Sequence, residues 1–231
     1  MGRVGAFFDM DKTLIDENSG SLYMKHRYER GEISALELAK GLGAYLQYKA
    51  GILDIVSWTK EMLAEFAGRI VSEIESEADD WMIEELIAHL YPEARSLVEH
   101  HQDEDHLVAI VSGSTDFVVN PLARYLGIDH VLATRLEQEG GCFTGDVVEP
   151  ICFEEGKVHW LSHLVTEHDI DLARSWFYTD SITDIPLLEL VGHPVVVNPD
   201  PRLYREAARR RWPVRMFASP GEPSPRVSRV R

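Results

Sequence analysis

Short apolar runs that stop at polar residues predict buried strands in this chain. The first spans Arg3 to Phe8 and the second spans Leu107 to Val111. Further runs at Ser175–Thr179 and Pro194–Val197 are separated by segments with helical patterns. All four are too short for helices, and strands that alternate with helices predict a parallel sheet covered on both faces.

A long block between the first two predicted strands shows helical patterns only. It extends from about Ser19 to Gln102, and within it apolar residues recur at three- and four-residue steps from Ile52 to Ile74. That stripe predicts an amphipathic helix. Ser34 and Glu37 have the spacing of a capping box, which predicts a helix start. Because the block interrupts the alternation of strands and helices, we expect it to be an inserted helical cap.

The second half of the chain adds a hairpin and several helices. The runs His130–Leu136 and Cys142–Val148 flank a Glu-Gly-Gly turn and predict a hairpin. Helices are predicted over Asp116–Leu126, Glu155–Glu167, Ile182–Val191 and from about Pro201. The resulting fold class is α/β, a Rossmann-like three-layer core with a parallel sheet plus a helical cap inserted after the first strand. We expect the core in residues 1–16 and 103–218 and the cap in residues 17–102.

Composition agrees with a folded protein and gives no sign of a membrane span. The chain has 231 residues, of which 45% are hydrophobic, and its longest stretches without a charged residue are ten residues long. A helix that crosses a bilayer needs about 20 apolar residues. The first residues also lack the features of a secretion signal, so we expect a cytoplasmic protein without stable membrane insertion. Two cysteines are too few for a disulfide framework.

Charge is spread unevenly along the chain. The net charge is −16, but the segment from Arg202 to Arg231 carries +7, which leaves −23 for the rest. An acidic body disfavours nonspecific binding of nucleic acid, and we expect no such partner. The basic residues 219–231 are rich in Pro, Ser and Arg, and we expect a disordered, solvated tail rather than a contact with an anionic surface.

Polar residues follow the predicted strands at the edge where ligands bind in open parallel sheets. They are Asp9, Asp11, Ser112, Gly113, Asp180 and Asp184, with Lys157 at the start of a helix. Each alone is compatible with a helix cap, a turn or the surface. Their joint placement favours a site instead. Clustered carboxylates repel one another unless a divalent cation neutralises them, and oxygen ligands suit Mg²⁺.

Four segments resemble, in order, the motifs of the haloacid dehalogenase (HAD) superfamily. They are Phe8-Asp9-Met10-Asp11-Lys12-Thr13-Leu14, Ser112-Gly113, Lys157 and Tyr178-Thr179-Asp180-Ser181-Ile182-Thr183-Asp184. The resemblance covers roughly Arg3 to Phe217, and four ordered motifs are much more specific than one. The helical block resembles the cap of the phosphoserine-phosphatase-like branch, subfamily IB.

The resemblance implies a Mg²⁺-dependent phosphomonoester hydrolase that works through a phospho-aspartyl intermediate. Asp9 would attack phosphorus, and Asp11 would protonate the leaving alcohol and later deprotonate water. The cofactor Mg²⁺ would be held by Asp9, the backbone carbonyl of Asp11 and Asp180, with support from Asp184. The phosphate oxygens would be held by Ser112, the Gly113 amide and Lys157.

The substrate is predicted only as a small phosphorylated metabolite. Phosphoserine phosphatases carry an acidic cap residue nine positions after the nucleophile, where this chain has Asn18 beside Glu17. We therefore take Glu17 and Asn18 as candidate specificity residues and keep both phosphoserine-like substrates and histidinol phosphate. Tyr23 and Tyr45 are candidate aromatic contacts from the cap.

Three other functions use the same motifs. A phosphomutase or phosphotransferase would transfer phosphate rather than release it. A non-catalytic regulatory binding module would show no Mg²⁺-dependent turnover, although it has no need to gather repelling acids. A lipid-phosphate phosphatase would need the basic tail, Ser219–Arg231, for vesicle binding.

Overall fold

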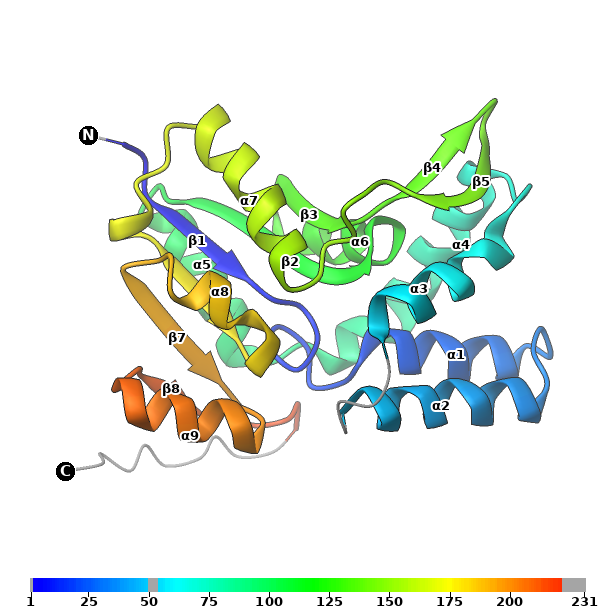
Figure 1. Ribbon diagram of the computed structural model, residues 1–231, viewed down its shortest axis with the longest axis horizontal. Coiled ribbons are helices and arrows are strands. Elements are labelled where there is room, and N and C mark those ends of the chain that lie inside the picture. Colours follow the sequence, from blue (N-terminus) through cyan, green and yellow to red (C-terminus); the bar gives the residue numbers. More distant parts are fainter. Residues whose placement is uncertain (1, 50–53, 222–231) are drawn as a thin grey trace.

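The computed structural model describes residues 2–49 and 54–221 and shows the predicted α/β fold. A six-stranded parallel sheet has the order β3-β2-β1-β6-β7-β8 (Figure 1). Its strands are β1 (Gly5–Phe8), β2 (Leu107–Thr115), β3 (His130–Thr134), β6 (Trp176–Thr179), β7 (His193–Val197) and β8 (Val214–Arg215). All neighbouring strands pair in parallel. The central strands β1, β2 and β6 are mostly buried, because their side chains alternate between two covered faces of the sheet.

Two apolar layers cover the sheet. Ala6 and Phe8 of β1 belong to a cluster that includes residues of α5 (Pro92–Asp103) and α6 (Asp116–Leu126). Phe7, between them, belongs to the opposite cluster. That cluster includes residues of α7 (Glu155–Glu167), α8 (Ile185–Leu188) and α9 (Pro201–Arg210). The alternation along β1 therefore produces the three-layer core.

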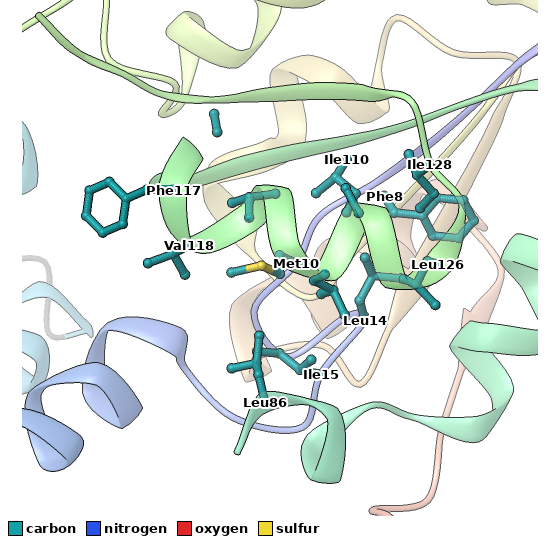
Figure 2. Packing of buried hydrophobic residues seen from close by; sticks show 14 of the residues in the cluster. Phe8, Met10, Leu14, Ile15, Leu86, Ile110, Phe117, Val118, Leu126 and Ile128 are labelled. Atoms are coloured by element: carbon teal, nitrogen blue, oxygen red, sulfur yellow. The ribbon is translucent and has the colours of Figure 1, made fainter. Parts of the chain in front are cut away.

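The chain that follows β1 remains buried as it leaves the sheet. Met10, Leu14 and Ile15 are fully buried, and Figure 2 shows them beside α6 together with Leu86. This packing fixes the loop that carries the first two aspartates of the candidate site, because a loop with three core side chains cannot shift without opening the core.

A helical segment follows β1 and lies beyond the end of that strand (Figure 1). Its elements are α1 (Ser19–Glu29), α2 (Ala35–Lys49), α3 (Ile55–Leu63), η1 (Ala64–Phe66), α4 (Val71–Glu84) and η2 (Leu86–His89). The chain segments that enter and leave this helical segment pair with each other through a short β-bridge. Ile15 pairs with Leu90, and the Asp16 amide donates to the His89 carbonyl at 2.9 Å.

The structure corrects the single amphipathic helix predicted from Ile52 to Ile74. Ile52 lies outside the described residues, and the rest forms α3, η1 and the start of α4. The break occurs at Gly68, whose φ of +78° is left-handed. The predicted capping box at the start of α2 is confirmed. The Ser34 amide donates to Glu37 Oε2 at 2.7 Å, and the Glu37 amide donates to Ser34 Oγ at 3.3 Å.

The predicted hairpin is also corrected. His130–Thr134 joins the main sheet, and the hairpin is β4 (Leu136–Glu139) with β5 (Cys142–Val147). This hairpin fastens onto the helical segment. The Gly68 amide donates to the Phe143 carbonyl at 2.8 Å, and the Phe143 amide donates to the Arg69 carbonyl at 3.0 Å. A main-chain pairing of this kind is invisible in the hydrophobic pattern of either segment.

The helix predicted over Ile182–Val191 is shorter in the structure. It consists of η4 (Ile182–Asp184) and α8. Pro186 in the first turn of α8 has no amide to donate to the preceding turn, so a new helix begins there. Both cysteines are free thiols, as expected. Within residues 2–49 and 54–221, no helix has the length and apolarity that a membrane span requires. The predicted tail lies outside the described residues from position 222 onward.

Candidate active site

The loop after β1 places two aspartates at the carboxyl edge of the sheet. β1 lies between β2 and β6, and the Asp9 amide donates to the Tyr178 carbonyl of β6 at 2.9 Å. Asp9 is therefore anchored to the central strands, and its side chain is buried. Asp11 follows two residues later, where the chain turns toward α1.

A buried lysine joins two of the predicted acids. Lys157, in the first turn of α7, donates to Asp9 Oδ1 at 2.9 Å and to Asp184 Oδ2 at 2.8 Å. The side chains of Lys157, Asp9 and Asp184 are only 4%, 9% and 1% exposed. One positive charge thus faces two carboxylates in a dry environment, where removing it would leave both acids uncompensated.

Within the part of the chain that the structure describes, only one of the two carboxylate oxygens of Asp184 has hydrogen-bond partners. Thr179 Oγ1 donates to Asp184 Oδ2 at 2.6 Å, on the same oxygen that receives Lys157. Asp184 Oδ1 is buried and has no hydrogen-bond partner among the described residues. A buried carboxylate oxygen without a donor is costly in a folded protein unless a cation or an ordered water approaches it.

Burial and the neighbouring opposite charges have opposite effects on the pKa values of Asp9 and Lys157. Burial raises the pKa of the Asp9 carboxyl to about 7, although the neighbouring Lys157 charge lowers it. Burial disfavours the charged Lys157 amine, but the charges of Asp184 and Asp9 outweigh that effect and raise its pKa. Lys157 therefore remains a cation at neutral pH, whereas Asp9 depends on it to ionise.

Asp11 lies apart from this trio and is held by the start of α1. Asn18 Nδ2 donates to Asp11 Oδ2 at 2.8 Å, and the Ser19 amide donates to Asp11 Oδ1 at 3.0 Å. Burial raises the pKa of Asp11 to about 6, against the hydrogen bonding from Ser19. The carboxyl is therefore poised between its acid and base forms near neutral pH.

The orientation of the Asn18 amide follows from the cap that it makes on α1. Asn18 Oδ1 accepts hydrogen bonds from the Ser21 amide at 2.9 Å and from Ser21 Oγ at 3.0 Å. Since a backbone amide can only donate, the oxygen of Asn18 faces Ser21 and its nitrogen faces Asp11. Both ends of this side chain are engaged.

The end of β2 presents the predicted phosphate-binding residues. Ser112 is 1% exposed, and its Oγ accepts from the Ser114 amide at 3.2 Å. The Gly113 carbonyl accepts from Thr134 Oγ1 at 2.9 Å, which fixes the peptide on the β3 side. Ser114 Oγ lies 2.7 Å from Ser19 Oγ and so links the end of β2 to α1.

These residues surround one cavity of about 570 Å³. Its wall includes Asp9, Asp11, Asn18, Ser112, Gly113, Lys157 and Asp180. Asp184 lies behind this wall and reaches the site through Lys157. Glu17 is not among the lining residues, and its half-exposed side chain pairs with Lys12 at 3.0 Å. Of the two candidate specificity residues, only Asn18 thus borders the cavity.

The donor set is compatible with Mg²⁺. No group of three His, Cys, Asp or Glu side chains in the described part of the chain is arranged as a complete metal site. Mg²⁺ is commonly held by only one or two carboxylates, together with water and substrate phosphate. Asp9 and Asp180 line the same cavity, and Asp184 Oδ1 is a buried acceptor to which no described residue donates. These oxygens fit a hard cation.

Several residues of the site escaped the sequence analysis. Thr179 orients Asp184, and Ser19 and Ser114 connect α1 to the end of β2. Thr179 stands directly before Asp180 and could have been suspected from that position. The role of Ser19 depends on the direction in which α1 leaves the loop after β1, for which the sequence carries no signal. The side chain of Tyr45 lies outside the described residues.

The chain matches one family model and is similar to several named proteins. The family model described as haloacid dehalogenase-like hydrolase matches residues 6–189. A histidinol-phosphatase of Neisseria meningitidis serogroup C is 34% identical over 92% of this chain and 98% of its own. Phosphoserine phosphatase SerB1 of Mycobacterium tuberculosis is 30% identical over 92% of this chain and 70% of its own.

Solved structures agree on the fold. A protein of unknown function from Bordetella pertussis Tohama I has a TM-score of 0.83 and 30% identity, with 93% of this chain and 98% of that chain covered. A phosphoserine phosphatase solved as a phospho-aspartyl intermediate analogue has a TM-score of 0.67 and 18% identity, with 95% of each chain covered. At 18% identity the second likeness concerns the fold alone.

Proposed function

The chain belongs to the haloacid dehalogenase-like hydrolases and is a phosphatase of that family, and we propose that its substrate is a small phosphorylated metabolite. The hydrolysis would proceed through a phospho-aspartyl intermediate, with Mg²⁺ as cofactor. The observation that carries the proposal is the contact of the Lys157 cation with the buried Asp9 carboxylate at the cavity wall. A carboxylate held ionised beside a cationic phosphate site is a nucleophile for phosphorus.

In the first step, Asp9 attacks phosphorus while the bond from phosphorus to the alcohol oxygen breaks. Asp11 donates a proton to the departing alkoxide, which leaves as the alcohol. The pKa of about 6 that burial gives Asp11 keeps part of the enzyme in the required acid form near neutral pH.

In the second step, a water oxygen attacks the phosphoryl group and the bond to Asp9 breaks. Asp11, now ionised, takes the proton from this water. The donors Asn18 Nδ2 and the Ser19 amide stabilise that ionised form, because both point at its carboxylate oxygens. The same side chain thus serves both steps, once as acid and once as base.

The remaining polar residues hold the phosphoryl oxygens and the cation. Ser112 Oγ, the Gly113 amide and Lys157 supply donors where charge accumulates in the transition state. Asp9, the Asp11 carbonyl and Asp180 would hold Mg²⁺, with Asp184 in support. The cation, when bound, offsets the repulsion between the Asp9 carboxylate and the phosphate dianion.

Histidinol phosphate and phosphoserine-like esters are the two substrate candidates. The named relatives include a histidinol-phosphatase and a phosphoserine phosphatase at similar identity, so the names do not decide between them. Asn18 does not decide either, because its amide is uncharged and engaged at both ends, and histidinol phosphate and phosphoserine both carry an amine. The cytoplasmic location stays a prediction.

The test is phosphate release from histidinol phosphate, phosphoserine, sugar phosphates, nucleotides and lysophosphatidate, with Mg²⁺ and with EDTA. We expect metal-dependent release that Asp9→Asn abolishes and that the exposed-surface variant Asp129→Asn retains. Substantial turnover by Asp9→Asn would refute the nucleophile assignment. Transfer of phosphate without release would support a phosphomutase, and an absence of turnover from every ester would support a regulatory module.

A further inference from the structure

Apolar and aromatic side chains line a large part of the cavity. They include Tyr23, Met24, Trp58, Met62, Phe66 and Phe117. We call these six residues the cap subsite. Five come from α1, α3 and η1, and Phe117 comes from α6 of the core. Phe66 and Phe117 touch, with ring centroids 5.4 Å apart, so the subsite is closed where cap and core meet.

Charged side chains around the cap subsite are already paired. Arg27 lies within 3.6 Å of Glu65 and within 3.6 Å of Glu32. Lys12, on the cavity wall nearer the sheet, pairs with Glu17. A carboxylate on the substrate would have to displace one of the glutamates from Arg27 or Lys12, or remain unpaired in an apolar pocket, and both cost binding energy.

We propose that the cap subsite selects phosphate esters whose alcohol carries a flat ring and no carboxylate. The inference rests on the proposed phosphatase function and adds the substrate class. With phosphate held by Ser112, Gly113 and Lys157, the leaving alcohol must point into the remaining space. That space offers aromatic faces and edges, which bind rings better than they bind small zwitterions. A substrate as compact as phosphoserine would leave this apolar wall exposed to trapped water.

Substitution of Trp58 tests the role of the cap subsite. It lies on α3, lines the cavity and is only partly buried, so its removal leaves the core clusters intact. Tyr28 is the matched control, because it is an aromatic residue of α1 that is 42% exposed and is not among the lining residues.

The experiment compares kcat/KM for four esters of primary alcohols: ethyl, 2-phenylethyl and octyl phosphate, and O-phosphoserine. We expect 2-phenylethyl phosphate to exceed each of the other three by about ten-fold or more, the scale on which an apolar pocket separates substrates. Trp58→Ala should lower the ratio of 2-phenylethyl to ethyl phosphate about ten-fold, and Tyr28→Ala should leave it unchanged. Because the ratio is independent of the amount of folded enzyme, a partly folded variant remains informative.

The outcomes separate the two proposals. Phosphate release from these esters with no preference for the ring, or a ratio that Trp58→Ala leaves unaltered, would overturn the cap subsite while the phosphatase mechanism stands. A preference for octyl phosphate would also overturn it, in favour of an acyl-chain substrate. If none of the esters is hydrolysed, and the broader panel is equally inert, the proposed function itself fails.

Discussion

Asn18 joins the start of the helical segment to the candidate acid–base residue, because its Nδ2 donates to Asp11 Oδ2 at 2.8 Å while its Oδ1 caps α1. One side chain therefore contacts both the start of α1 and the carboxyl of Asp11. A movement of α1 relative to the sheet would withdraw a donor from Asp11, so the orientation of the cap and the strength of the acid are mechanically coupled.

Two substitutions of Asn18 together distinguish its cap on α1 from its contact with Asp11. Asn18→Ala removes the acceptor that caps α1 and should lower the free energy of unfolding by about 1 kcal/mol. It also removes a donor to a carboxylate, an interaction of about 1.5–3 kcal/mol, so kcat should fall about ten- to a hundred-fold. Urea unfolding and steady-state kinetics measure the two effects.

Asn18→Asp supplies the matched control for that experiment. An aspartate keeps the acceptor for the Ser21 amide, so stability should remain close to that of the wild type. Its carboxylate would face Asp11, raise the pKa of Asp11 above about 6 and slow the step in which Asp11 acts as base. Wild-type turnover by Asn18→Asp would show that the contact with Asp11 is not used.

Lys157→Met should destabilise the protein in a pH-dependent way. The variant leaves Asp9 and Asp184 buried without their shared cation, which typically costs about 3–5 kcal/mol. Loss of the lysine charge raises the pKa of Asp9 above its value of about 7, so the protonated native state becomes accessible below that pH. The loss of stability should thus be large at pH 8 and smaller at pH 5.

Urea unfolding of wild type and Lys157→Met at both pH values gives this difference directly. Lys25→Met is the control, since Lys25 is an exposed residue of α1 that pairs only with Glu29 in the described part of the chain. A destabilisation that is equal at pH 5 and pH 8 would mean that lost packing, rather than uncompensated charge, explains the effect.

The core was predictable because its signals are local. β1 and β2 are short apolar runs that end at polar residues, and α7 spans the predicted range Glu155–Glu167. Asp9 and Asp11 follow β1, Ser112 lies near the end of β2 and Lys157 is in the first turn of α7. The rule for parallel sheets was therefore enough to bring them to one edge. Their meeting at a single cavity needed no knowledge of side-chain geometry.

The contacts between the cap and the core were not predictable in this way. The hairpin β4–β5 binds residues near Gly68 through backbone hydrogen bonds, which leave no trace in hydropathy. The placement of Asn18 depends on how α1 starts, and that of Trp58 on the angle at which α3 returns to the cavity. Such long-range pairings are decided by packing between elements, and one sequence does not encode them as a pattern.

Gly145→Ala should weaken the attachment of hairpin β4–β5 to η1. Gly145 has a φ of +94°, and a Cβ there would lie 2.9 Å from Ala67 Cβ. We expect backbone strain of about 1–2 kcal/mol together with an overpacking cost of about 1–3 kcal/mol. Gly141→Ala, at a φ of +83° with open space around it, carries the strain alone. Equal unfolding free energies for both variants would rule out the tight contact with Ala67.

His101 should make stability depend on pH on the acid side. Its ring is 2% exposed, and its two nitrogens lie 2.8 Å from His106 Nδ1 and 2.9 Å from the Tyr178 hydroxyl. Burial, with smaller repulsion from His106, His100 and Arg215, lowers the pKa of His101 to about 4. The unfolded chain binds this proton near pH 6.5, so native stability should fall as pH drops from about 6.5 to 4, by up to roughly 3 kcal/mol.

The check is a series of urea unfolding curves between pH 7 and pH 4.5. His101→Gln cannot take up the proton, so its curve should be flatter than that of the wild type over this interval. His100→Gln, at an exposed position on the same helix, should keep the wild-type slope. If His101→Gln retains the full slope, another group takes up the proton.

Mg²⁺ should stabilise the protein in the absence of any substrate. Among the described residues, Asp184 Oδ1 is buried and has no donor, and several aspartates line the cavity wall. This arrangement is unfavourable without a nearby cation. A ligand that binds only the native state raises stability by mass action. At a concentration 100 times the dissociation constant, the gain is about 2.7 kcal/mol. Thermal unfolding with and without Mg²⁺ should therefore show a rise in Tm that Asp180→Asn abolishes and Asp129→Asn retains. A rise of equal size in Asp180→Asn would show that Asp180 does not contribute to the binding of the cation.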